Sequence, residues 1–587
     1  MTTGESTAPA LVLGPMLRYV SETEVTIWVE TDRECLVEIL GRGVPTFEVA
    51  GHHYGLVVID GLAPDSEHEY GVVLDDTVRW PLADGGFPPS VLRTLGRDRP
   101  VRLAFGSCRV AEIAPKNLSR RARRERARRE SAGRPAGEEA ADALAATATM
   151  LADLPPDRRP DVLLMIGDQV YADEPGPATR RFIADHRAAT PGMTAPPREV
   201  ADFDEYCALY REAWSAPAVR WLLSVIPTAM VFDDHDVHDD WNISGSWRRD
   251  YGAKPWWGRR IESAYQSYWV YQHVGNLSPA ELATDETWSK VRAQGDAAPA
   301  LADLAHRADR REPGIRWSFA RTFRTTGDTT GGKVRVVMLD SRSRRVVDGT
   351  RLMADEAEWR WLTESVAGDW EHVVIATSVP PLLPRGIHTL EAWTEKVCGG
   401  AWGRRAARFG EGLRRGFDLE HWPAFGASFT QLEKLLTELA TGPRGPHGTL
   451  VPRGEPPASV TIISGDVHHS YLAAVNLPRQ AAGPTRTSAV YEAVCSPLHQ
   501  AMPPTMRNAQ RLASTGICGL IGAAVAALAG AHAPRIGWRV TAGPWFENMI
   551  ATLEYDARTA TIRFDRAVSD PRGAPRLRAA NETRLSS

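Results

Sequence analysis

The chain has 587 residues, of which 43% are hydrophobic and 24% charged, and its formal net charge is −4. This composition is typical of a globular protein and excludes a wholly disordered or fibrous chain. The near-neutral charge also argues against a protein held on nucleic acid mainly by its overall charge, so we expect no nucleic-acid partner.

The start of the chain lacks the features of an export signal. No Lys or Arg precedes Arg18, and no apolar stretch with a small-residue cleavage site follows a basic segment. The six cysteines are too sparse for a disulfide scaffold. Together these observations predict a cytoplasmic protein.

Residues 11 to about 96 have the pattern of an all-β region. Apolar or alternating segments are separated by Gly, Pro and Asp turns, at residues 25–30, 35–40, 53–60 and 69–75. The stretch that ends at Tyr70 resembles the tyrosine corner of fibronectin-type sandwiches. We therefore predict a fibronectin/immunoglobulin-like sandwich over residues 1–98 that has a structural or docking role.

From residue 101 short apolar strands alternate with helical patterns, which is typical of an α/β domain. The predicted strands are residues 101–105, 161–166, 228–232, 334–339, 372–376 and 460–464. The predicted helices cover residues 202–224, 258–274, 354–366 and 428–440. We place one domain at residues 99–568, followed by a polar tail at 569–587 that we expect to be disordered.

Three further segments stand out in composition. The charged run 119–131 reads as a solvated helix or insertion, or else as a nucleic-acid-binding segment. Residues 119–150 and 275–313 have the character of insertions around the sheet. Residues 512–534 carry no formal charge and predict a buried or interfacial helix rather than a stable membrane span.

Polar motifs follow five of the predicted strands at the point where each strand ends. In open α/β sheets ligands bind beyond the carboxyl ends of the strands, so we expect these motifs to meet at one edge. The motifs are GSCR (106–109), GDQVY (167–171), DDHDVHDDWN (233–242), DSR (340–342) and GDVHH (465–469).

The residue types in these motifs favour two adjacent metal ions. Carboxylates combined with one or two His and a Tyr or Cys suit hard or borderline cations rather than a structural zinc. Gly167 allows a sharp turn before Asp168, which frees that carboxylate to bridge two metals. Two such ions make a water nucleophilic and stabilise both oxygens of a phosphoryl displacement.

Competing motifs fail on spacing. The sequence contains no GxxxxGK[ST], GxSxG or HExxH. Residues 233–240 lack the glycine of an EF-hand loop. An acidic helix N-terminus would explain this one stretch, but not the five motifs together.

At these motifs the sequence resembles the alkaline phosphatase D (PhoD-like) metallophosphatases, within the calcineurin-like metallophosphoesterases. The resemblance extends from about residue 99 to about 568, and the preceding all-β region resembles the N-terminal domain that these proteins often carry. It implies an α/β (α+β layered) metallophosphoesterase-like β-sandwich core flanked by helices. It also implies a phosphoric ester hydrolase that cleaves monoesters, diesters or both with a metal-activated hydroxide at a di- or multinuclear site.

The resemblance also implies residue roles, position by position. Cys108 would supply a thiolate ligand, Asp168 a bridging carboxylate and Tyr171 a phenolate, while His235 would act as general acid or orienting group. The other implied metal ligands are Asp233, Asp234, Asn242, Asp466 and His468, with Asp173 and Asp236 as weaker candidates. Arg109 and Arg342 are candidates for phosphate contact, although Arg342 could equally pair with Asp340.

The implied cofactors are two or more divalent or trivalent metal ions. The resemblance suggests iron with calcium, and the sequence does not determine their identity. The expected substrates are small-molecule or lipid phosphate esters. Two alternatives stay open: an interaction protein with little or no activity and a structural metal site, and a membrane-associated phospholipid phosphodiesterase that uses residues 512–534.

Overall fold

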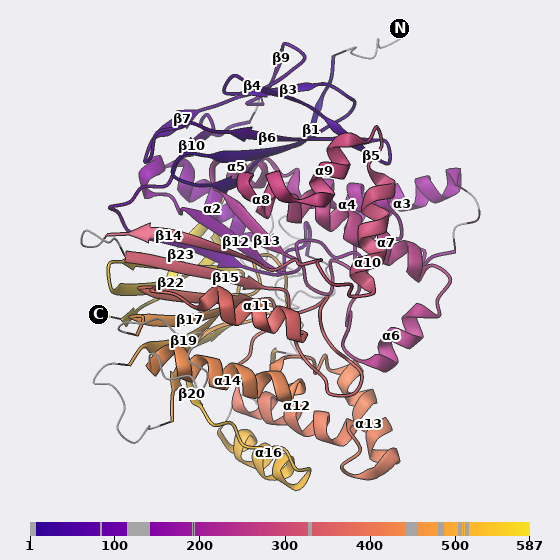
Figure 1. The fold of residues 1–587 in the computed structure, drawn as a ribbon, viewed down its shortest axis with the longest axis vertical. Coiled ribbons are helices and arrows are strands. Elements are labelled where there is room, and N and C mark those ends of the chain that lie inside the picture. The colour runs from indigo at the N-terminus through magenta and orange to yellow at the C-terminus, as the bar shows by residue number, and fades with distance from the viewer. Residues whose placement is uncertain are drawn as a thin grey trace.

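The computed structural model is mixed α/β, with an all-β region at the N-terminus and two large sheets in the middle (Figure 1). It describes residues 8–586 except 83–84, 114–140, 191, 193, 327–331, 442–455, 479–486, 503–506, 509 and 511–515. The charged run at 119–131 therefore lies outside the described residues.

The N-terminal strands are antiparallel, as the turn spacing predicts. They are β1 (Leu11–Val20), β2 (Val25–Thr31), β3 (Leu36–Ile39), β4 (Arg42–Pro45), β5 (Phe47–Val49), β6 (His52–Ile59), β7 (Glu67–Glu69), β8 (Val72–Leu74), β9 (Thr77–Trp80) and β10 (Val91–Arg93). The two four-stranded sheets have the orders β1-β2-β6-β5 and β4-β3-β8-β9, and β10 pairs with β7.

Tyr70 differs from the tyrosine-corner expectation. Its buried hydroxyl donates to the backbone oxygen of Ser224, 2.6 Å away, rather than to the strands of its own domain. The contact therefore joins the N-terminal domain to the rest of the chain.

A six-stranded sheet carries three of the predicted strands. Its order is β13-β12-β11-β21-β22-β23, with β11 (Val101–Gly106), β12 (Val162–Ile166) and β13 (Thr228–Val231) parallel to one another. The antiparallel strands are β21 (Met549–Asp556), β22 (Thr559–Ser569) and β23 (Pro575–Ser586). The expected disordered tail is thus wrong, because these polar residues hydrogen-bond to β22 along its length.

A seven-stranded sheet carries the other three predicted strands, β15 (Gly332–Leu339), β16 (His372–Thr377) and β17 (Ser459–Ser464). They run parallel, next to β14 (Phe319–Thr325), β18 (Ser470–Asn476), β19 (Ala489–Val494) and β20 (Gly537–Trp545), in the order β14-β15-β16-β17-β19-β18-β20. Alternate residues of β15 face two cores: Val336 packs in the core shared with the six-stranded sheet, and Val337 packs beneath helices.

The helices lie around these sheets (Figure 1). Their bounds are α2 (Ala143–Ala152), α3 (Pro177–Ala189), α4 (Phe203–Trp214), α5 (Pro217–Val225), α6 (Gly245–Gly252), α7 (Trp257–Tyr268), α8 (Pro279–Thr284), α9 (Glu286–Ala293), α10 (Ala298–Asp309), α11 (Glu356–Val366), α12 (Arg385–Cys398), α13 (Gly403–Gly416), α14 (Gly426–Thr441) and α16 (Gly516–Leu528). The predicted helix 202–224 is two helices, because Pro217 starts a new one.

Two of the segments singled out in the sequence are helical. Residues 275–313 contain α8, α9 and α10. The described part of 512–534 contains α16, which has 13 residues. Among the described residues, no helix is both long and apolar enough to cross a bilayer.

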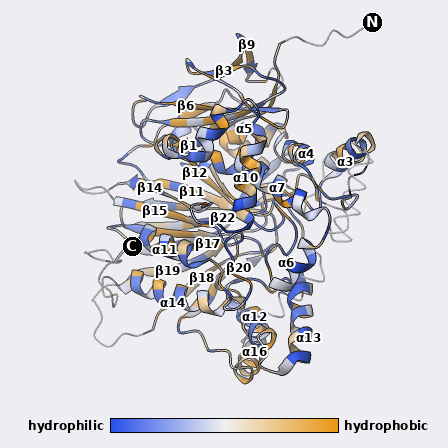
Figure 2. Ribbon diagram, turned by 45° about the vertical axis from the view of Figure 1, so that its right-hand side comes forward, coloured by the Kyte–Doolittle hydropathy of each residue, from blue (hydrophilic) through white to orange (hydrophobic). Residues whose placement is uncertain are grey.

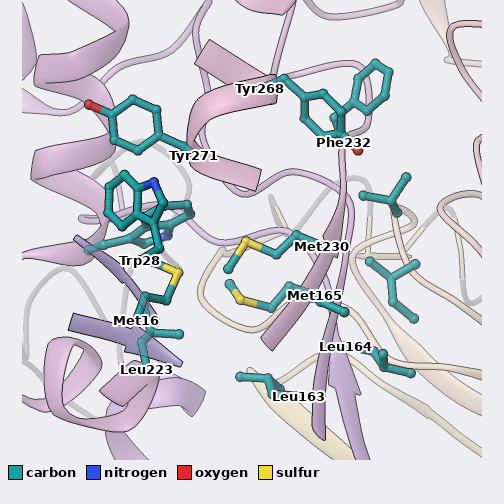
Figure 3. Close-up of a cluster of buried hydrophobic side chains, with 14 of the residues drawn as sticks. Met16, Trp28, Leu163, Leu164, Met165, Leu223, Met230, Phe232, Tyr268 and Tyr271 are labelled. Carbon is teal, nitrogen blue, oxygen red and sulfur yellow. The ribbon is translucent and has the colours of Figure 1, made fainter. Parts of the chain in front are cut away.

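The N-terminal domain and the six-stranded sheet share a buried contact. Met16 and Trp28 approach Met165 and Met230 of β12 and β13 (Figure 3). The rings of Trp28 and Tyr271 have centroids 5.3 Å apart. Burial of this apolar surface fixes the N-terminal domain against the strands that carry the polar motifs.

Candidate metal centre

The motifs at the ends of β11, β12 and β17 share an unusual backbone conformation. Positive φ angles occur at Cys108 (59°), Asp168 (51°), Asp466 (65°) and His468 (51°). Non-glycine residues adopt this region rarely, and such strain clusters at functional sites. The turns bring residues from three strands of two sheets to one place.

The first group of potential metal ligands contains a thiol, a carboxylate, an imidazole and a phenol. Single ligand atoms of Cys108, Asp168 and His468 all lie within 4.8 Å of one another. The Tyr171 hydroxyl is 3.4 Å from Asp168 Oδ2 and 3.5 Å from His468 Nε2. All four side chains come from motifs that the sequence singled out.

The second group consists of carboxylates. Oxygens of Asp168, Asp233, Asp234 and Asp466 lie within 4.8 Å of one another. Asp168 belongs to both groups, so the two potential sites are adjacent and share one carboxylate.

The residues of both groups fit metal ions. Asp168 Oδ1 and Asp233 Oδ2 are buried and have no hydrogen-bond partner among the described residues. Burial and neighbouring carboxylates raise the pKa of Asp168, and burial raises the pKa of Asp233 to about 8 despite the nearby Arg342. Such a concentration of buried carboxyl groups is expected where a cation offsets their charge.

Cys108 lies in the same environment. Burial and the charges of Asp168 and Asp466 raise the pKa of its thiol well above the usual range. The hydroxyls of Ser107 and Ser496 lie 3.1 and 3.2 Å from its sulfur. A bound cation would favour the thiolate instead.

His235 lies beside the two groups. Its Nδ1 is 3.0 Å from Asp173 Oδ1, and its ring centroid is 4.3 Å from that of Tyr171. Burial alone would lower the pKa of His235, but the carboxylates of Asp173 and Asp234 raise it well above the ordinary value. Asp173 thus orients the imidazole and favours its charged form.

Arg342 does not reach a position open to a phosphate. Its guanidinium is fully buried and binds Asp233 and Glu420 by short contacts, with Asp234 Oδ1 at 3.0 Å. Only its backbone N–H binds Asp340, at 2.9 Å. Arg342 therefore balances carboxylate charge from within the protein.

Arg109 and Asn242 hydrogen-bond to other parts of the chain. The guanidinium of Arg109 donates to Asp142 Oδ2 at 2.6 Å and to the backbone of Ala213. The Asn242 amide donates to the backbone oxygen of Arg342 at 3.1 Å and accepts from Arg248 at 3.3 Å. Neither side chain lies within the two groups of potential ligands.

Both carboxylate oxygens of Asp236 accept hydrogen bonds from within the protein. Its Oδ2 accepts the backbone N–H of Asp233 at 2.9 Å, and its Oδ1 accepts from Gln272 at 2.9 Å. It fixes the turn that presents Asp233 and Asp234.

Two further residues of the centre, His421 and Glu391, lie outside the five sequence motifs. His421 Nε2 lies 2.8 Å from Asp466 Oδ2, and its Nδ1 lies 2.6 Å from Glu391 Oε1, which belongs to α12. Because His421 follows neither a strand nor a recognisable motif, only the tertiary structure reveals it.

A cavity of about 470 Å³ lies next to this centre. Its lining includes Arg109, Tyr171 and Asp173, together with Arg180, Arg198 and Glu212. It offers space for an organic group beside the metal ligands.

Comparisons with known proteins agree with these observations. Residues 144–368 match the family model described as PhoD-like phosphatase, and residues 8–92 match a domain of unknown function (DUF7800). No curated protein gives a significant match. The chain also matches a solved structure of PhoD, with 14% identity and a TM-score of 0.53, over 99% of this chain and 94% of that one.

The family match confirms the resemblance noted in the sequence, and the structural match shows the shared fold. Two of the five motifs, at 106–109 and 465–469, lie outside the residues of the family match. Their position next to the matched motifs comes from the fold.

Proposed function

We propose that this chain is a metal-dependent phosphoric ester hydrolase whose two metal sites share Asp168. The observation that supports it most is the overlap of two groups of buried ligand atoms at that carboxylate. The match of residues 144–368 to the PhoD-like phosphatases points to the same reaction class.

The two sites would hold unlike cations. Cys108, Tyr171 and His468 with Asp168 offer sulfur, phenolate and imidazole, which suit a transition metal such as iron. Asp233, Asp234 and Asp466 offer only oxygen, which suits a hard cation such as calcium. When bound, such a pair supplies a nucleophilic water and neutralises phosphoryl charge.

The chain's own residues would orient the ester and move the proton. With Asp173 on Nδ1, His235 keeps Nε2 directed to the other side of the ring, where it can donate a proton to the leaving oxygen. The cavity beside Tyr171 and Asp173 would take the leaving group. Arg342 would hold Asp233 and Asp234 in place rather than contact phosphate.

The domain organisation belongs to the same proposal. A sandwich domain ends near residue 98, and the catalytic domain follows from residue 99. Because β23 completes the six-stranded sheet, the catalytic domain extends through residue 586.

Asp168→Asn tests the proposal. We expect the variant to lose hydrolysis of p-nitrophenyl phosphate and of its bis ester, and to bind less metal by elemental analysis. Asp303→Asn, at an exposed carboxylate on α10, is the matched control and should keep both properties. Undiminished turnover in Asp168→Asn would refute the site, whereas two bound ions without turnover on any ester would favour a structural metal site.

A further inference from the structure

The helices α12, α13 and α16 lie together at the end of the molecule opposite the N-terminal strands (Figure 2). In this view α16 is mostly hydrophobic and α13 mostly hydrophilic. The described residues of α16 include no charged side chain. The two helices therefore give this end of the protein a mixed surface.

The large side chains of α16 face solvent. Leu520 is 75% exposed, Ile521 61%, Val525 37% and Leu528 78%. At 100° per residue, these four positions fall within an arc of about 140° on one side of the helix. This side is a continuous apolar face rather than a set of scattered residues.

The opposite side of α16 is built of small residues and packs on α12. A Cβ on Gly519 would lie 2.8 Å from Arg385 Cβ, and one on Gly522 would lie 2.2 Å from Thr389 Oγ1. Ala526 on the same side is 5% exposed. A water-facing helix normally buries its large apolar residues, so the reversed arrangement in α16 indicates an apolar environment outside the protein.

The C-terminal end of α16 adjoins the start of α13, which carries basic residues. The indole nitrogen of Trp402 lies 3.4 Å from the backbone oxygen of Leu528, at the C-terminal end of α16. Directly after Trp402, α13 exposes Arg404, Arg405 and Arg408. Within the described part of the chain, none of these arginines forms an ion pair with a carboxylate.

Two exposed aromatic residues lie next to these arginines in the chain. Trp402 is 45% exposed, and Phe409, on the same side of α13 as the three arginines, is 64% exposed. We name the set of Leu520, Ile521, Val525, Leu528, Trp402, Phe409, Arg404, Arg405 and Arg408 the end surface.

We propose that the end surface docks on a lipid surface that carries anionic headgroups. Aliphatic and aromatic side chains beside unpaired arginines are the combination that binds the interface of an anionic bilayer, with the apolar residues in the acyl boundary and the cations at the headgroups. A second copy of this chain fits less well, because self-association through this surface would bring the arginines of two copies together without a partner charge.

The docking does not depend on the proposed hydrolase activity. The residues of the end surface are not among the ligands of the candidate metal centre. Binding to vesicles can thus be measured separately from turnover.

The test uses the full chain and sedimentation with vesicles. We expect binding to phosphatidylcholine vesicles that contain phosphatidylglycerol, with much weaker binding to phosphatidylcholine alone and a decrease at high salt. Leu520→Ser with Leu528→Ser should weaken binding by at least about tenfold, and so should Arg404→Gln with Arg405→Gln and Arg408→Gln. Turnover of a soluble ester should be unchanged in both variants.

Val78→Ser, at a 66% exposed position on β9, is the matched control and should bind like the unmodified chain. Failure of the unmodified chain to bind anionic vesicles would overturn the proposal, and so would equal binding by the end-surface variants. A dimer in sedimentation velocity that dissociates in Leu520→Ser with Leu528→Ser, without vesicle binding by the unmodified chain, would instead assign the surface to self-association.

Discussion

At the scale of single residues, the candidate metal centre depends on backbone turns that the side chains alone do not reveal. Cys108, Asp168, Asp466 and His468 each have a positive φ angle. Each such residue costs on the order of 1 kcal/mol, and the surrounding sheets must hold it in place. The strain directs the side chains of separate strands toward one another.

Gly167 tests the importance of this turn. Its φ is 90°, and a Cβ there would lie 2.7 Å from Asp233 Cβ. Gly167→Ala should lower the free energy of unfolding by about 2–4 kcal/mol and reduce metal content, because both the turn and Asp233 must move. Denaturant unfolding and elemental analysis measure the two effects.

Gly41→Ala is the matched control, since Gly41 also has a positive φ, 74°, but has open space around it. Gly41→Ala should lower the free energy of unfolding by only about 1 kcal/mol and leave the metal content unchanged. Equal effects of the two substitutions would show that the contact with Asp233 is unimportant.

His421 provides a second test at this scale. We expect His421→Ala to weaken metal binding by about 10–100-fold, because the imidazole orients the Asp466 carboxylate and is itself held by Glu391. Isothermal titration of the metal-free protein with metal measures the affinity. A purely structural role would lower thermal stability without changing that affinity.

His306→Ala is the control, because His306 is exposed on α10 and pairs with Glu262 away from the centre. Unchanged metal affinity in His421→Ala would contradict the positioning role.

Some contacts of the centre can be predicted from the sequence and others cannot. Cys108, Asp168, Tyr171, Asp466 and His468 follow strand ends, so the sheet topology brings them together as the sequence predicts. Arg342 is different, because its guanidinium binds Glu420, on a segment without any motif. The sequence alone does not indicate which carboxylates the long Arg342 side chain binds, because this depends on the folded structure.

At the scale of elements, buried strands are easier to predict than exposed ones. The strands β11, β12, β13, β15, β16 and β17 are apolar runs buried in the two central sheets, and the sequence predicts all of them. The strand β23 is polar along most of its length, and only its pairing with β22 defines it. The polar composition of this segment therefore wrongly predicts a disordered tail where the structure has an edge strand.

Leu585 measures whether β23 contributes to stability. It is 3% exposed within an otherwise half-exposed strand. Leu585→Ala should lower the free energy of unfolding by about 2–3 kcal/mol, because it removes buried apolar atoms. Arg578→Ala, at an exposed position of the same strand, should change it by less than about 0.5 kcal/mol. Chemical denaturation compares the two, and equal small effects would indicate that the strand is not formed in solution.

At the scale of the whole molecule, a polar network joins the N-terminal strands to the rest of the chain. His52 of β6 lies 2.7 Å from Asp204 of α4 through Nε2, and its Nδ1 lies 2.9 Å from Arg211. Arg211 in turn binds Glu30 of β2 at 2.6 Å. Tyr70 and the apolar contact around Trp28 act between the same parts. The N-terminal domain is therefore an integral part of the structure.

The contact with Arg211 fixes how His52 hydrogen-bonds. Because a guanidinium only donates, His52 Nδ1 accepts from Arg211 at 2.9 Å, and Nε2 therefore donates to Asp204 at 2.7 Å. The neutral imidazole thus connects an arginine to a carboxylate across the junction.

We therefore expect His52→Ala to lower the free energy of unfolding by about 1–2 kcal/mol, because it leaves Arg211 and Asp204 without the group that connects them. His52→Gln should lower it by less, since an amide oxygen can accept from Arg211 while the amide nitrogen donates to Asp204. Urea unfolding measures both variants, and His306→Ala, at the exposed pair with Glu262, should change the free energy by less than about 0.5 kcal/mol. Equal effects of His52→Ala and His306→Ala would mean that the polar contacts of His52 do not stabilise the junction.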